Sequence, residues 1–496
     1  GLGEAGEARN TAHQQKKVKE EAVAKFGKRF DLPFADDKIA KLPFYKPADD
    51  SPEIHYLKER RKDLGGCMPA RAVHYPRLDA PADAVIEAFF KGSAGRAAST
   101  TMAFVDLLKR LMQDKELGKY IVPIIPDEAR TFGMEGMFTQ YGIYSSVGQL
   151  YEPVDHATLT RYREARDGVL IEEGITEAGA MSSFIAAGTA YANLGVPIVP
   201  FYIYYSMFGF QRVGDLIWAA ADMRARGFLL GGTAGRTTLA GEGLQHQDGH
   251  SHIAALTVPN VVAYDPAFAY EIALIVQDGI RRMYHNDESV FYYLTLGNEN
   301  YPMEPMPEGV REGVLKGMYR FRKSNLGKSA VKSPVHLLGS AAIFHDTLKA
   351  QQILAEKFGI AADVWSVTSY KELRREALEV ERHNRLHPAA PARKSYLETL
   401  LAPEKGVFIA ASDYQKSLPE SIQRWVPGGL IPLGTDGFGR SENRQSLRRF
   451  FEVDTENIVI ATLAELARRG EIPVDRVEKA IKELGVDPEK PDPVRA

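Results

Sequence analysis

The sequence is almost without cysteine, since Cys67 is the one thiol in 496 residues. A single thiol excludes an internal disulfide framework and any cage in which several cysteines hold zinc or an iron–sulfur cluster. A chain of this length buries enough apolar surface to be stable without such crosslinks, and two or three domains are expected. The scarcity of thiols fits a protein of the reducing cytoplasm.

The sequence also lacks an excess of charge of either sign. It carries 62 basic and 65 acidic side chains, so the formal net charge is −3. No general basic field is therefore available to attract nucleic acid or an anionic membrane. The longest apolar run, residues 195–210, contains two prolines and is shorter than the roughly 20 residues that span a bilayer. Small molecules or proteins are the expected partners.

The N-terminal region differs in composition from the rest of the chain. Residues 1–76 are rich in charge and interrupted by prolines, which is typical of connecting structure, with one helix expected between residues 14 and 30. The sequence begins with GLGEAGEARN and not with methionine. We therefore expect the chain to be a portion of a longer polypeptide.

From residue 99 onward, apolar stretches alternate with segments of helical periodicity. This alternation indicates α/β architecture, with parallel sheets flanked by helices on both faces. Ser99 fits the N-cap of a helix over residues 100–113, and the proline-rich stretch 298–309 is the expected break between two domains. Strands are expected at 120–126, 196–205, 228–232, 261–266, 290–296, 335–340, 362–369 and 406–412, and further helices at 174–195, 215–227, 271–284 and 345–358.

Three of the twelve histidines lie close together in the stretch GLQHQDGHSH. His246 and His250 have the spacing of one helix face, and His250 and His252 that of one strand face, so either pair could hold a metal. The flanking Gly243 and Gly249 make a regular helix improbable, and no cysteine or carboxylate pair completes a familiar ligand set. An active site without metal, a metal site and structural hydrogen bonding remain open at this point.

Glu177 opens a helix that is unusually rich in glycine, alanine and serine. Close packing of small residues leaves little room for water, which would raise the pKa of a carboxyl and let it share a proton with a ligand nitrogen. The alternative is an ionised carboxylate that the helix macrodipole stabilises. The sequence does not decide between the two.

Further candidate residues follow the expected strands, where parallel sheets gather their ligands. Asp127 and Glu128 come directly after one strand, and Tyr205 and Phe208 close the next. For the two aromatic residues, packing in the core is the simpler interpretation. The glycine-rich segment 231–243 matches neither of the common phosphate-binding fingerprints, and we interpret it as a loop that allows the chain to approach a ligand closely.

Several of these stretches together resemble one family. GEARNTAHQ, PIIPDEARTFGMEG, GITEAGA, PFYIYYSMFGFQRVGD, GRTTLAGEGLQHQDGHSH and LGTDGFGRSE are similar to the homodimeric bacterial type of pyruvate dehydrogenase, the decarboxylating component of a multienzyme complex that depends on thiamine diphosphate. The resemblance extends over essentially the whole chain. It implies a transketolase-like fold with parallel sheets flanked by helices, in which a pyrimidine-binding domain precedes a C-terminal domain.

The resemblance also implies domain boundaries. Residues 1–76 would be the tail of the diphosphate-binding domain, residues 77–306 the pyrimidine-binding domain, and residues 307–496 the C-terminal domain. The family's diphosphate signature, GDG with an asparagine some 30 residues later, occurs nowhere in the chain. The ligands of Mg²⁺ are therefore expected in a domain that this sequence does not contain, and we predict no metal ligand here.

The resemblance assigns roles to residues of the pyrimidine-binding region. Glu177 would hydrogen-bond a pyrimidine ring nitrogen of thiamine diphosphate, Ile175 would support the bent cofactor, and Phe208 would stack on the pyrimidine with Tyr205 nearby. His246 would face the substrate and the intermediate. These five positions combine cofactor binding with catalysis.

The resemblance also implies roles for Asp127, Glu128 and His13, and it implies partners. Asp127 and Glu128 would lie near the pyrimidine amino group, and His13 would belong to a mobile loop that helps to transfer the acetyl group to lipoamide. Arg9, in the same loop, has no specific role assigned, and His250 and His252 are left as structural residues. The implied partners are pyruvate, the lipoyl domain of a dihydrolipoyl acyltransferase, and a second copy of the chain in a homodimer.

The expected activity is oxidative decarboxylation of pyruvate with transfer of the acetyl group to a lipoyl group. A related enzyme that acts on another 2-oxo acid, or a transketolase-like enzyme, is an alternative, because the missing domain also shapes the substrate pocket. A second alternative is an inactive assembly fragment that lacks the diphosphate half of the site. A metal hydrolase that uses His246, His250 and His252 is the least favoured.

Overall fold

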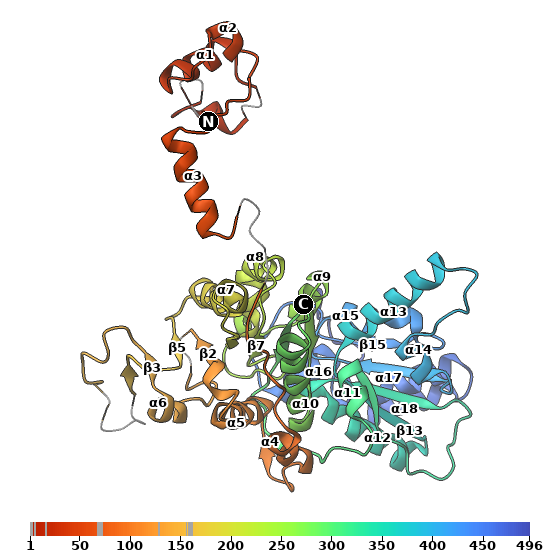
Figure 1. Ribbon diagram of the computed structural model, residues 1–496. Helices are drawn as coiled ribbons and strands as arrows, with labels where there is room; N and C mark the ends of the chain where they lie inside the picture. Colours follow the sequence, from red (N-terminus) through yellow and green to blue (C-terminus); the bar gives the residue numbers. More distant parts are fainter. Residues whose placement is uncertain are drawn as a thin grey trace. The chain divides into compact units, whose positions relative to one another are not determined.

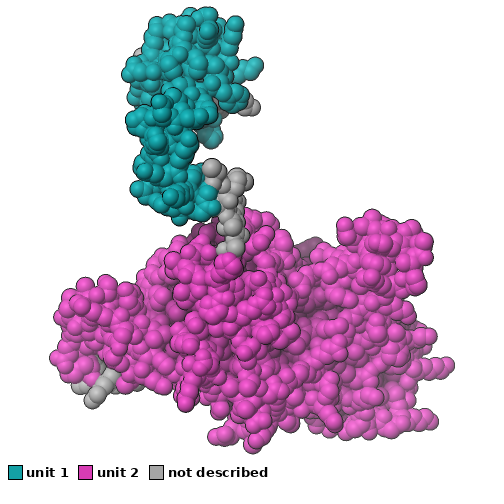
Figure 2. All heavy atoms as spheres, viewed as in Figure 1, with its two compact units in different colours: residues 1–72 teal, residues 73–496 magenta. Residues whose placement is uncertain are grey.

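The computed structural model describes residues 3, 6–14, 17–66, 73–126, 129–154, 156 and 162–496. These residues form two compact units, 1–72 and 73–496, which are coloured separately in Figure 2. Among the described residues, no helix combines the length and the apolar character needed to cross a membrane.

The first unit is helical. It contains the 3₁₀ helix η1 (Asn10–Gln14) and the helices α1 (Glu20–Arg29), α2 (Asp36–Ile39) and α3 (Pro52–Asp63). The helix expected between residues 14 and 30 is confirmed as α1, but α3 was not expected. No residue of α3 is buried, so this helix has no apolar stripe from which periodicity could predict it. Its start is fixed locally, because the Ser51 hydroxyl accepts a hydrogen bond from the backbone N–H of Ile54 at 3.3 Å.

A six-stranded parallel sheet forms the first half of the second unit (Figure 1). Its strand order is β5, β2, β6, β7, β9, β8. The strands are β2 (Ile121–Ile125), β5 (Ile171–Glu172), β6 (Val199–Tyr205), β7 (Phe228–Gly232), β8 (Val261–Tyr264) and β9 (Phe291–Thr295). The central strands β6, β7 and β9 are almost entirely buried, which explains why they were recognisable as continuous apolar runs.

Helices cover both faces of this sheet, with α7 and α8 on one side and α5 and α10 on the other (Figure 1). Their bounds are α5 (Thr100–Gln113), α7 (Glu177–Asn193), α8 (Gly209–Asp222) and α10 (Ala269–Ile280), followed by a π-helical turn, η6 (Arg281–His285). The predicted cap is confirmed, since the Ser99 hydroxyl accepts from the Met102 N–H at 3.1 Å. A Cβ on Gly188 of α7 would lie 2.6 Å from the carbonyl oxygen of Arg226, so the small residues of α7 permit close backbone packing.

A five-stranded sheet forms the second half of the unit, in the order β11, β13, β12, β14, β15. The strands are β11 (Met318–Arg322), β12 (Val335–Gly339), β13 (Ala362–Val367), β14 (Val407–Ala411) and β15 (Ile431–Leu433). All pair in parallel except β11, which is antiparallel to β13 at the edge. β11 and β15 were not expected, because both are only partly buried and lack a continuous apolar run.

Helices flank this second sheet as well, with α12 and α17 on one side and α13 on the other (Figure 1). The larger helices are α12 (Phe344–Phe358), α13 (Tyr370–Leu386), α16 (Arg444–Phe451), α17 (Thr455–Arg468) and α18 (Val474–Glu483). The smaller elements are α4 (Asp83–Ile86), η2 (Glu87–Lys91), β1 (Ala97–Ala98), η3 (Gly118–Tyr120), α6 (Gly136–Tyr141), β3 (Ile143–Tyr144), β4 (Glu164–Ala165), η4 (Ser206–Phe208), η5 (Leu244–His246), α9 (Ser251–Thr257), β10 (Tyr301–Pro302), α11 (Arg311–Lys316), η7 (Ala341–Ile343), α14 (Tyr396–Leu401), α15 (Ser417–Glu420) and η8 (Gln423–Trp425).

The two sheets share one apolar core. The rings of Phe268, Phe321 and Phe344 join them, with centroid separations of 5.4 Å and 5.0 Å for consecutive pairs. Beside these rings, the buried carboxylate of Glu271 accepts hydrogen bonds from the hydroxyls of Tyr319 and Ser366, both at 2.7 Å. Shared apolar and polar contacts thus hold the two halves as one compact unit.

Candidate active site

Four of the predicted residues gather beyond the carboxyl ends of β6 and β7. Tyr205 ends β6, Phe208 ends the following turn η4, Glu177 begins α7, and His246 ends the turn η5. The His246 ring lies 4.9 Å from the Tyr205 ring and 5.0 Å from the Phe208 ring, measured between centroids. This is the edge at which parallel sheets bind their ligands.

Glu177 is held by the start of its helix. The Thr176 hydroxyl accepts from the Gly179 N–H at 3.2 Å and so caps α7, which fixes Glu177 in the first turn. The Glu177 side chain is only 12% exposed, and its Oε1 accepts a hydrogen bond from Nη1 of Arg212 at 3.0 Å. The sequence leaves two environments open for this carboxylate, a site with little water and a helix N-terminus. The structure has features of both, because the carboxylate is shielded from most water and lies in the first turn of α7.

Arg212 is a site residue that the sequence analysis missed. Its guanidinium carbon lies 3.8 Å from the centroid of the Phe208 ring while the same group pairs with Glu177. A planar cation on an aromatic face is a favourable cation–π geometry. The spacing of four residues between Phe208 and Arg212 on successive turns was the available signal.

The orientation of His246 follows from the preceding turn. Its Nδ1 lies 3.1 Å from the carbonyl oxygen of Glu242, and since a carbonyl can only accept, the neutral ring carries its proton on Nδ1 and its lone pair on Nε2. Gly241 and Gly243 have φ values of 85° and 81°, which favour glycine on either side of Glu242. His246 is half-buried and can therefore reach a ligand.

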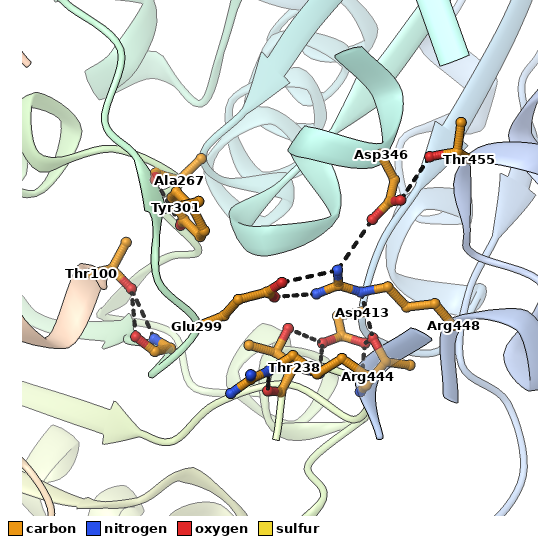
Figure 3. Close-up of polar contacts among 12 residues, drawn as sticks. Thr100, Thr238, Ala267, Glu299, Tyr301, Asp346, Asp413, Arg444, Arg448 and Thr455 are labelled. Carbon is orange, nitrogen blue, oxygen red and sulfur yellow. Dashed lines mark hydrogen bonds and ion pairs between the residues drawn. The ribbon is translucent and has the colours of Figure 1, made fainter. Parts of the chain in front are cut away.

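The segment that leads to His246 is anchored by the second half of the unit. Asp413 accepts four hydrogen bonds, from the backbone N–H groups of Thr237 and Thr238 at 2.8 Å and 3.0 Å and from their hydroxyls at 2.6 Å and 2.7 Å. Figure 3 shows the contact with Thr238 next to the ion pair between Arg448 and Glu299. Burial raises the pKa of the Asp413 carboxyl, although the Arg448 charge and these donors oppose the effect.

A second anchor follows His246 directly. The side-chain amide of Gln247 donates to the carbonyl oxygen of Arg440 at 2.6 Å, and its oxygen accepts from the Arg440 N–H at 2.7 Å. Before the turn, Arg236 donates to the carbonyl oxygen of Thr435 at 2.6 Å. His246 therefore lies between two stretches of backbone that the second half of the unit holds in place.

Two other polar residues of this stretch, Asp248 and His252, make structural contacts. Asp248 accepts from the N–H groups of His250 and Ser251 at 3.0 Å and 2.9 Å and so secures the start of α9. His252 is buried, Nε2 lies 2.9 Å from the Thr295 hydroxyl, and burial lowers its pKa to about 4. Among the described residues, the histidines of this stretch belong to no cluster with metal-ligand spacing.

One cluster elsewhere has that spacing, formed by His336, Asp363 and Glu404. Arg320 already pairs with both carboxylates. The Trp365 indole N–H faces Nδ1 of His336 at 3.3 Å, so the neutral ring carries its proton on Nε2, the nitrogen nearest Glu404. A metal on Nε2 would move the ring proton to Nδ1, where it would face the indole N–H, and the cluster is explained by its ion pairs with Arg320.

The other predicted residues are distributed differently. Ile175 is 73% exposed, two residues before Glu177. His13 lies on η1 of the first unit and is exposed. Asp127 and Glu128 lie outside the described residues, directly beyond Pro126 at the end of β2.

The site chemistry fits a planar nitrogen heterocycle. The Arg212 guanidinium is flat, donates N–H to Glu177 and covers Phe208, which are the contacts that an aminopyrimidine ring with a protonated nitrogen would make.

Comparison with known proteins agrees with this arrangement. Residues 75–304 match the family described as pyruvate dehydrogenase E1 component middle domain, and residues 317–454 match the transketolase-like C-terminal domain. Among solved structures, transketolase from Campylobacter jejuni aligns with a TM-score of 0.57 at 17% identity, over 90% of this chain and 58% of that one. Transketolase from Leishmania mexicana aligns with a TM-score of 0.54 at 16% identity, over 92% and 53%. The fold is therefore that of the transketolase-like α/β proteins.

Relatives of higher identity define the family more narrowly. The pyruvate dehydrogenase E1 component of Pseudomonas aeruginosa is 54% identical over 99% of this chain and 55% of its own length. Those of Cupriavidus necator and Escherichia coli are 50% and 46% identical, over 100% and 99% of this chain and 55% of their own lengths. The chain belongs to the pyruvate dehydrogenase E1 component family and carries its middle and C-terminal regions. It spans about half the length of these relatives.

Proposed function

We propose that this chain forms part of an enzyme that decarboxylates pyruvate oxidatively with thiamine diphosphate and passes the acetyl group to a lipoyl group of a dihydrolipoyl acyltransferase. The observation that carries the proposal is the placement of the Glu177 carboxylate beside the Phe208 ring, both in contact with one planar N–H donor. Membership of the E1 family supports it.

Four residues would hold and serve the cofactor. Glu177 would share a proton with a pyrimidine ring nitrogen at Oε1, Phe208 would stack on the ring, and Tyr205 and Ile175 would flank it. When bound, thiamine diphosphate supplies a carbon nucleophile and takes up the electron pair released as carbon dioxide leaves. The apolar surface of Tyr205 and Phe208 keeps water away from the reacting groups, which strengthens polar interactions there.

His246 would act on the substrate side. Because Glu242 holds its Nδ1 proton, Nε2 is the atom available to accept a proton from the substrate or to donate one after protonation. Asp127 and Glu128 would lie near the pyrimidine amino group, and His13 would assist acetyl transfer to the lipoyl domain. These three assignments follow the family resemblance.

The proposal includes components that the chain does not supply. Mg²⁺ and the cofactor diphosphate would be held by a separate diphosphate-binding region, and a homodimer would complete the site. We propose residues 1–76 as the tail of that region, 77–306 as the pyrimidine-binding domain and 307–496 as the C-terminal domain. A cytoplasmic location is part of the proposal.

Replacement of the central carboxylate tests the proposal. In the full-length protein that contains this chain, Glu177→Gln should slow exchange of the thiazolium C2 proton of thiamine diphosphate with solvent deuterium by at least about 100-fold, the usual minimum for loss of a positioned acid or base. The measurement is proton NMR after acid quench. Glu116→Gln is the matched control, because this carboxylate is 89% exposed and pairs with Lys119. Exchange at the wild-type rate in Glu177→Gln would contradict the assignment.

A second candidate is an assembly portion that binds no cofactor by itself. The coverage of only 55% of each relative favours it. Calorimetry of the isolated chain with thiamine diphosphate and Mg²⁺ distinguishes the candidates, because tight binding would exclude the assembly portion.

A further inference from the structure

Arg212 makes two contacts that the proposed function assigns to the cofactor. Its Nη1 donates to Oε1 of Glu177 at 3.0 Å, and its guanidinium carbon lies 3.8 Å from the Phe208 centroid. A pyrimidine ring bound to Glu177 and stacked on the same face of Phe208 would require this space. The guanidinium and the ring therefore exclude one another.

Two further rings lie against the Phe208 ring. His246 lies 5.0 Å and Tyr205 6.1 Å from Phe208, measured between ring centroids. The Phe208 ring thus has aromatic neighbours in addition to the guanidinium. A ligand that stacks on the face of Phe208 covered by the guanidinium and accepts or donates at Oε1 of Glu177 takes the position of Arg212.

We propose that Arg212 is an internal ligand of the pyrimidine subsite, and that its displacement sets how tightly the site takes its ring. This inference rests on the proposed function. In the absence of cofactor, the guanidinium satisfies the Glu177 carboxylate and covers Phe208. Binding of the ring breaks both contacts. The measured affinity is therefore weaker than the affinity of the ring for an empty site, by the free energy needed to displace Arg212.

The position of Arg212 permits this displacement. The Arg212 side chain is 51% exposed, whereas that of Glu177 is 12% exposed, so the arginine can turn into water while the carboxylate stays in place. The next residue, Val213, has φ −123° and ψ 23°, a break in the helical geometry of α8. The first turn of α8 is therefore separated from the regular part of the helix.

The expected effect is moderate. A half-exposed ion pair and a single cation–π contact together correspond to about a 10-fold change in a dissociation constant. Arg212→Gln removes the charge and both contacts, and should tighten binding of thiamine diphosphate by about this factor. Arg212→Lys keeps a cation but not the flat donor surface, so its affinity should lie between those of wild type and Arg212→Gln.

The affinities are measured by calorimetry with thiamine diphosphate and Mg²⁺ on the full-length protein. Arg110→Gln is the matched control, because Arg110 also pairs with a carboxylate, Asp106 at 3.3 Å, and lies 5.4 Å from the ring centroid of Phe89, away from the site. This control should bind as the wild type does.

Chemical competition gives a second measurement. In Arg212→Ala, methylguanidinium should re-enter the vacated position and weaken cofactor binding competitively, while the wild type should show a smaller effect at the same ionic strength. Competition of equal strength in both proteins would overturn the inference.

The outcomes separate the inference from the proposed function. No binding by wild type or any variant would contradict the proposed function. Binding by wild type that is unchanged or weaker in both Arg212→Gln and Arg212→Lys, with Arg110→Gln unaffected, would overturn the role of Arg212 alone.

Discussion

The two ends of the segment from Arg236 to His246 differ in almost every contact. At one end, Thr237 and Thr238 are buried and all their N–H and hydroxyl groups reach Asp413. At the other end, His246 is half-buried, and its ring bonds the Glu242 carbonyl through Nδ1, which leaves Nε2 available. The buried end secures the backbone that leads to the half-buried imidazole of His246.

The largest expected effect comes from removal of the anchor. Asp413→Ala leaves four buried donors without an acceptor, which should lower the free energy of unfolding by about 3–5 kcal/mol. Urea unfolding of the chain measures it. The control is Asp475→Ala, because Asp475 is an exposed residue whose partner is Lys479. If Asp413→Ala lowers the free energy of unfolding by no more than Asp475→Ala does, Asp413 does not anchor the segment.

Replacement of His246 should affect turnover strongly and stability little, in contrast to Asp413→Ala. His246→Ala should reduce turnover of pyruvate in the full-length protein by at least about 100-fold, as expected for a proton-transferring group, with a change in unfolding free energy below about 1 kcal/mol. Steady-state kinetics and urea unfolding measure the two quantities. A stability loss as large as that of Asp413→Ala would erase the distinction between the two ends.

Asp265 should make the buried region sensitive to pH. Its carboxylate accepts from Thr295 and Ser340 at 2.6 Å and 2.8 Å, and burial raises its pKa from 3.8 to about 7, with further increases from Asp413 and Asp248. Between these two values the folded protein binds more protons than the unfolded chain, so stability should fall as pH rises through this window. The slope from this group is at most about 1.4 kcal/mol per pH unit.

Asp265→Asn tests this pH dependence. The amide does not titrate, so unfolding free energies measured in urea between pH 4.5 and 7 should vary less than those of the wild type. An unchanged slope would assign the pH dependence to other groups.

Local sequence features predicted most of the central fold. The buried strands β6, β7 and β9 are continuous apolar runs, and the N-cap at Ser99 is a side-chain to backbone contact within three residues. Such signals depend only on residues that are close in sequence, and the structure contains the elements that they predict. The exposed helix α3 and the edge strand β11 have no comparable signal, because neither buries a continuous apolar stripe.

The sequence by itself determined the α/β alternation, the buried strands, and the presence of Glu177, Tyr205, Phe208 and His246 in stretches typical of the E1 family. Only the tertiary structure decided that Arg212 contacts Glu177, 35 residues away, and that Asp413 holds Thr237, 176 residues away. Periodicity and capping are set by nearby residues, whereas these contacts depend on how separate segments of the chain pack together at the edge of one sheet and beside the other. No pattern of neighbouring residues in the sequence predicts these long-range contacts.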